Sequence, residues 1–226
     1  MEIKPSTIYG IIGKTSKEIK IELQELYPNK TIYLVKEELK TNEYYSNLYE
    51  RMKYEIKRKK LIIKNLDKKI IDSLKIVGLR KELLSHNINT LSLSEKKCIG
   101  VALSLITNPD IIIIENLYQH FDKKLTKKIN ILLQKIKDQY QKTIILIDTD
   151  SNNLYQYTNR IIFYKKDNQV LDIKTEEFYQ DRNFLKKNKI EIPEIVEITN
   201  LAKKKNIKLD YHKDIRDIIK DIYKHV

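Results

Sequence analysis

Two uninterrupted apolar runs with a helix-like segment between them constrain the fold of this chain most strongly. The runs cover residues 111–114 (IIII) and 144–147 (IILI), and the second predicts a strand over 143–147. Strands that are apolar on both faces are typical of the centre of a parallel sheet, where helices cover both sides. The segment between them carries apolar residues at helical spacing: Leu125, Ile129, Leu132, Leu133 and Ile136. This order predicts right-handed crossovers and an α/β fold with a mostly parallel sheet.

The segment before the first run predicts a capped helix. Ser92 and Glu95 stand three residues apart, the spacing of a reciprocal capping box. Cys98 falls on the apolar face of this helix, so we interpret it as a core residue. As the only cysteine, it excludes an internal disulfide and a multi-cysteine metal site. The four histidines show no ligand spacing, and we expect no metal site.

The flanking segments complete the predicted architecture. Strands are expected at 7–12 and 31–35, helices at 16–26 and across 41–84, a hairpin at 160–164 and 169–173, and a last helix near 214–223. We therefore predict a main domain over 1–165, with a helical subdomain at about 41–106. A small hairpin and helical appendage would occupy 166–226.

The charge balance is strongly basic. Lys and Arg number 44 against 31 acidic residues, which gives a net charge of +13. Such a surface favours nucleic acid or an anionic membrane face, although a solvated basic surface with no partner also explains it. No apolar run approaches the roughly 20 residues that cross a bilayer. The start, MEIKPSTIYG, lacks the apolar stretch of a secretory signal, so a cytoplasmic location is expected.

An ordered series of motifs resembles an ATP-binding cassette (ABC) ATPase. LSLSEKK (91–97), the Asn108-Pro109-Asp110 turn, the isoleucine run with Glu115-Asn116, Asp122 and TIILIDTD (143–150) match the signature, Walker B strand, D-loop and switch strand. Residues 159–179 and 184–210 are similar to the C-terminal part of the A component of energy-coupling factor transporters. The resemblance implies a P-loop-NTPase-like fold and an appendage that joins two ATPase subunits.

The Walker A loop departs from the family pattern. Phosphate loops need several close glycines, and this chain has 4 where average usage would give about 16. If Gly13, Lys14 and Thr15 open the loop, four following residues replace the expected types: Ser16, Glu18, Ile19 and Lys20. If they instead end a G-x-x-x-x-G-K-[ST] motif, Ile8 stands where glycine is required. Gly13, Lys14, Thr15, Ser16 and Glu115 would thus hold ATP and Mg²⁺ at most weakly.

The catalytic positions are altered as well. Glu115 replaces the Walker B aspartate, and Asn116 replaces the glutamate that acts as general base. An amide cannot accept the proton of the attacking water. Thr149 takes the place of the switch histidine and Lys36 that of the Q-loop glutamine, whereas Asp122 keeps the D-loop identity. We therefore expect no catalytic residue and no hydrolysis by the chain alone.

The signature allows two interpretations. In the family, Ser92, Ser94 and Glu95 would face ATP held by the partner subunit. Leu93, however, places a side chain where the backbone must approach the γ-phosphate. Ser92 and Glu95 could equally serve only to cap the helix.

The resemblance implies a degenerate ATP-binding subunit of an energy-coupling factor importer for a vitamin or similar micronutrient. It would lie peripherally on the inner face of the cell membrane, pair with a complete ATPase and dock the membrane T component through about 36–60. The Tyr-rich part of that segment (Tyr44, Tyr45, Tyr49, Tyr54) also suits a plain surface or base stacking. The alternative function is a non-catalytic basic α/β module that acts on nucleic acid.

Overall fold

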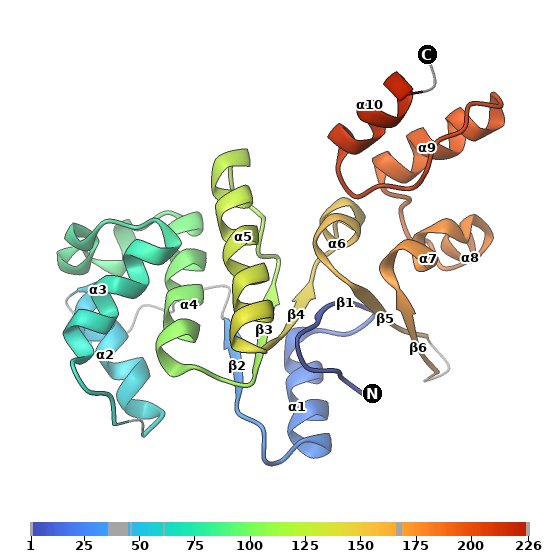
Figure 1. The fold of residues 1–226 in the computed structure, drawn as a ribbon. Coiled ribbons are helices and arrows are strands. Elements are labelled where there is room, and N and C mark those ends of the chain that lie inside the picture. The colour runs from blue at the N-terminus through green and yellow to red at the C-terminus, as the bar shows by residue number, and fades with distance from the viewer. Residues whose placement is uncertain (1, 36–44, 46, 61, 166–168, 225–226) are drawn as a thin grey trace. The chain divides into compact units, whose positions relative to one another are not determined.

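The computed structural model describes residues 2–35, 45, 47–60, 62–165 and 169–224 (Figure 1). It has the predicted mixed α/β fold, in which parallel strand pairs outnumber antiparallel ones among the described pairs. The chain divides into two compact units. The first contains Met1–Ser6 and Thr15–Ile145, and the second contains Thr7–Lys14 and Leu146–Val226.

The first unit holds the predicted helical region. Its strands β2 (Ile32–Val35) and β3 (Ile111–Glu115) pair in parallel, with Ile32 opposite Ile111. Its α-helices are α1 (Ser16–Leu26), α2 (Leu48–Arg58), α3 (Leu66–Val77), α4 (Leu93–Thr107) and α5 (Lys123–Tyr140). Two 3₁₀ helices, Lys81–Ser85 and Ile88–Thr90, separate α3 from α4. Strand β4 (Thr143–Ile147) begins in this unit and ends in the second.

Helix α4 and strand β3 form the centre of the first unit. All four isoleucines of β3 are buried, as expected for a strand covered on both faces. Residues 97–104 of α4 are also buried on every side, which is typical of a central helix. Gly100 allows α4 to approach β2, because a Cβ there would lie 2.6 Å from Val35 Cγ1. Helix α3 packs against both α4 and α5.

The second unit contains the predicted hairpin and the C-terminal helices. Strand β1 (Ile8–Ile12) pairs in parallel with β5 (Arg160–Tyr164), which pairs antiparallel with β6 (Val170–Lys174). The helices are α6 (Ser151–Tyr157), α7 (Thr175–Gln180), α8 (Arg182–Lys187), α9 (Glu194–Lys204) and α10 (Ile215–Lys224). Aromatic rings fill its core: Tyr155 meets Tyr179 edge-on, and Phe163 contacts Phe178 and Phe184.

Local sequence signals agree closely with the observed elements. The predicted helix at 16–26 and the strand at 143–147 have the bounds of α1 and β4. The helical stretch predicted over 41–84 contains α2 and α3. Gly78, with φ of +91°, ends α3 in the left-handed conformation that glycine tolerates. The boundary predicted after residue 165 stays a prediction. No helix in the described parts of the chain combines the length and apolar character that crossing a bilayer demands.

Candidate functional site

A connection of three residues, Gly13, Lys14 and Thr15, joins β1 to α1. Thr15 caps the helix, because its hydroxyl accepts a hydrogen bond from the Glu18 N–H at 3.4 Å. In return, Glu18 Oε2 accepts hydrogen bonds from the Thr15 N–H at 2.8 Å and the Thr15 hydroxyl at 2.7 Å. A helix N-terminus attracts anions through such N–H groups. Here the chain's own Glu18 carboxylate caps the helix N-terminus.

Gly13 and Lys14 both turn toward β5. Gly13 has φ of +98°, and a Cβ there would lie 2.6 Å from the Tyr164 carbonyl oxygen. The Lys14 ammonium lies 4.2 Å from the centre of the Tyr164 ring, a cation–π distance. The residue that the sequence offers as a phosphate-binding lysine is therefore engaged with an aromatic ring of its own unit.

Ser16 and Glu115 lie 99 residues apart in the sequence, and the fold brings their side chains together. Ser16 begins α1, Glu115 ends β3, and the Ser16 hydroxyl donates to Glu115 Oε2 at 2.5 Å. The motif alignment predicted Lys20, not Ser16, at the position of the Mg²⁺-binding hydroxyl. Lys20 instead lines a small pocket near Tyr33. Ser16 is therefore the hydroxyl that the structure joins to the Walker B position.

Lys97 also contacts Glu115, and the sequence analysis did not predict this contact. Its side chain is buried, and its ammonium donates to the backbone carbonyl of Glu115 at 2.5 Å. The sequence signals were its place at the end of the LSLSEKK motif and its position next to Cys98, before the apolar part of α4. Cys98 itself is buried as predicted, and burial raises the pKa of its thiol to about 12.

The signature residues form the predicted helix cap. The Ser92 hydroxyl accepts from the Glu95 N–H at 3.2 Å, and Glu95 Oε2 accepts from the Ser92 N–H at 2.8 Å. The Ser94 hydroxyl lies 3.1 Å from that of Ser92. The capping interpretation is thus confirmed, whereas a role of these residues toward a partner's nucleotide stays a prediction.

The remaining candidate positions are divided between the two units. Asn116, which has φ of +48°, directly follows Glu115, and Asp122 caps α5 by accepting from the Leu125 N–H at 2.7 Å. Thr149 is exposed in the second unit. Burial raises the pKa of its neighbour, Asp148. Lys36 lies outside the described residues.

The start of α1 differs from the phosphate loop of the family pattern. A phosphate loop presents several converging N–H groups, whereas the connection here is short and closed by Glu18. The Ser16 hydroxyl is bound directly to Glu115. In the described parts of the chain, no group of three His, Cys, Asp or Glu side chains could hold a metal ion.

We expect Ser16→Ala to destabilise the first unit. The substitution removes a charge-assisted hydrogen bond from a partly buried carboxylate, which costs about 1.5–3 kcal/mol. Urea unfolding would measure the loss, with the exposed neighbour Lys17→Ala as the matched control. Combining Ser16→Ala with Glu115→Gln should cost less than the two single losses added together, because the two side chains interact. Equal effects of Ser16→Ala and Lys17→Ala would contradict the assignment.

Comparisons with known proteins identify similar sequences and similar folds. No protein-family model matches the chain. An energy-coupling factor transporter ATP-binding protein of Mycoplasma mobile is 27% identical over 151 residues, covering 67% of this chain and 49% of that protein. A counterpart in Malacoplasma penetrans is 28% identical over 142 residues, covering 63% and 49%. The chain thus spans about half the length of the curated relatives it matches.

Solved structures show the same fold. CbiO1 of Clostridium perfringens, described as part of the ABC transporter complex cbiONQ, has a TM-score of 0.63 at 18% identity, covering 88% of this chain and 90% of that one. The ATP-binding cassette MJ0796 has a TM-score of 0.62 at 21% identity, covering 77% and 88%. The chain therefore has the fold of ABC ATPase structures. In sequence, the chain is similar to ATP-binding proteins of energy-coupling factor transporters.

Proposed function

We propose that the chain is a degenerate ATP-binding subunit of an energy-coupling factor importer. The observation that carries this proposal is the capping box of Thr15 and Glu18 at the start of α1. A carboxylate at this helix end repels a phosphate from the place where family members would bind it. The subunit would hold ATP and Mg²⁺ weakly or not at all, and transport would depend on a partner with an intact phosphate loop.

The appendage supports pairing with a second ATPase subunit. Helix α10 exposes Ile215, Ile219 and Ile222 along one stripe, each between 39% and 47% exposed, while Ile218 is buried. Helix α9 adds the exposed Ile198 and Leu201. Exposed apolar side chains at this spacing are typical of a helix that docks on a partner. We infer that α9 and α10 bind the second subunit.

Helix α2 supports docking of the membrane T component. Arg51 lies 5.7 Å from the Tyr45 ring and 5.8 Å from the Tyr54 ring, and it pairs with Glu55 at 2.6 Å. This cluster directly follows 36–44, which lies outside the described residues. Arg51 is buried, but Tyr54 is exposed, and aromatic side chains are enriched at protein interfaces. The subunit would then lie on the cytoplasmic face of the membrane, and the cargo would be a vitamin or similar micronutrient.

Affinity purification of the tagged chain from gently solubilised native membranes tests this proposal. Mass spectrometry should recover a multispanning protein and a second ATPase with intact glycine loops. The double variant Ile215→Asp/Ile219→Asp should lose the second ATPase, while Lys220→Ala on the same helix should keep it. Recovery of soluble proteins only, or no difference between these variants, would refute the proposed assembly.

A basic groove in the second unit favours the alternative function, a module that binds nucleic acid. The groove has a volume of about 880 Å³ and lies beside Gly13 and Tyr164. It is lined by Lys165, Lys187 and Lys189 but, among the described residues, by no acidic side chain. Binding to single-stranded nucleic acid that weakens steeply with salt would support this function. Binding that is absent at moderate salt would leave the transporter proposal as the better one.

A further inference from the structure

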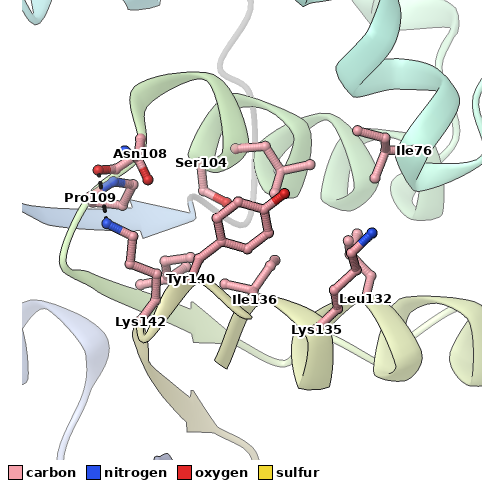
Figure 2. A pocket seen from close by; sticks show the side chains of 11 residues that line it. Ile76, Ser104, Asn108, Pro109, Leu132, Lys135, Ile136, Tyr140 and Lys142 are labelled. Carbon is pink, nitrogen blue, oxygen red and sulfur yellow. Dashed lines mark hydrogen bonds between the residues drawn. The ribbon is translucent and has the colours of Figure 1, made fainter. Parts of the chain in front are cut away.

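A cavity lies in the first unit, away from Ser16 and Glu115. Its volume is about 240 Å³, and it opens between α4 and α5 (Figure 2). Ile112, near the start of β3, forms part of its wall, whereas Glu115 ends the same strand. Three residues of strand span about 10 Å, so this cavity is separate from Ser16 and Glu115.

The interior of the cavity is apolar. Leu105, Ile112, Leu132 and Ile136 line it, and Ile76 contributes from α3. Apolar cavities hold water poorly, and one of about 150 Å³ accepts a guest the size of benzene. A cavity of about 240 Å³ therefore has room for a somewhat larger apolar group.

The rim of the cavity is cationic. Lys135 and Lys142 lie on opposite sides of the Tyr140 ring in Figure 2. The Lys142 ammonium reaches the Asn108 carbonyl only at 3.5 Å, the outer limit of a hydrogen bond. Lys135 makes no hydrogen bond or ion pair within the part of the chain that the structure describes. Among the described residues, no acidic side chain lines the cavity.

We propose that this cavity binds a small carboxylate with an apolar body, such as a medium-chain fatty acid. The apolar part would displace water from the surfaces of Leu105 and Ile136, where burial is favourable. The carboxylate would lie at the rim and accept charge-assisted hydrogen bonds from Lys135 or Lys142. Tyr140, which is 58% exposed, would cover the bound molecule with its ring.

Octanoate binding tests the proposal. The chain contains no tryptophan, so the fluorescence of one introduced tryptophan can report on the cavity. Tyr140→Trp places a single fluorophore at the mouth, whose emission should change saturably with octanoate. In that background, Lys135→Gln/Lys142→Gln should weaken octanoate about tenfold or more, since charge-assisted hydrogen bonds are lost. The matched control Lys123→Gln/Lys127→Gln alters two exposed lysines of α5 outside the cavity and should leave the affinity unchanged.

Uncharged 1-octanol distinguishes binding of the apolar body from binding of the carboxylate by the rim lysines. It should bind more weakly than octanoate and should not respond to loss of Lys135 and Lys142. Methyl NMR of the unsubstituted chain provides a second readout, in which the Ile112 and Leu132 signals should shift with octanoate. Absence of saturable binding by both readouts would overturn the proposal, as would octanoate affinity that the rim lysines do not affect.

Discussion

The purified chain is expected to hydrolyse ATP no faster than the buffer background, and Lys14→Ala is expected to leave that rate unchanged. Asn116 stands at the position of the general base, which contributes about 10²–10⁴-fold to the rates of enzymes that use one. The Lys14 ammonium lies over the Tyr164 ring in this structure. The expected loss of hydrolysis thus has two separate causes, in the base and in phosphate binding.

Equilibrium dialysis with ATP isolates the binding part of this prediction. Each charge-assisted phosphate contact contributes about 1.5–3 kcal/mol, so the loss of three weakens a micromolar site by about three decades or more. We therefore expect no saturation below millimolar ATP, with or without Mg²⁺. A catalytically complete ABC ATPase subunit would serve as the positive control in both assays. Clear turnover by the pure chain that Lys14→Ala abolishes would overturn the degenerate assignment.

Ile113→Ala is expected to have the largest effect on stability. Ile113 is 0% exposed in the middle of β3, and truncation of such a side chain costs about 2–5 kcal/mol, because a cavity remains. Ile131→Ala on α5 is the matched control: its side chain is 61% exposed, and its effect should stay within about 0.5 kcal/mol. Urea unfolding followed by circular dichroism measures both. Similar midpoints for the two variants would show that β3 is not the centre of this unit.

Elements with local signals could be predicted well. Ser92 and Glu95 lie within one helical turn, so their spacing alone predicted the start of α4. The apolar run at 144–147, preceded by the β-branched Thr143, predicts a strand with the observed bounds of β4. In such cases the interacting atoms are only a few residues apart, and the sequence shows their relation directly.

The candidate site was less predictable. The sequence predicts Ser16 as a weak nucleotide contact and Lys20 at the position of the Mg²⁺-binding hydroxyl. It does not predict the hydrogen bond between Ser16 and Glu115, because these residues lie 99 positions apart. Lys97 ends the signature motif, but its bond to the Glu115 carbonyl could not be predicted, because the fold decides which carbonyl its ammonium meets. The three-residue spacing of Thr15 and Glu18 is that of a capping box, but the motif alignment assigned these residues to a phosphate loop.

The sequence by itself determined the order of the described strands, the helical character of α1 to α5, and the cap of α4. Hydrophobic periodicity and capping depend on residues that are close together in the sequence, so a short stretch of sequence is enough to predict these features. Only the tertiary structure decided that Ser16 meets Glu115, that Lys97 binds the Glu115 carbonyl, and that α3, α4 and α5 line an open cavity. Those relations join residues far apart in the chain, and packing of the folded elements sets them.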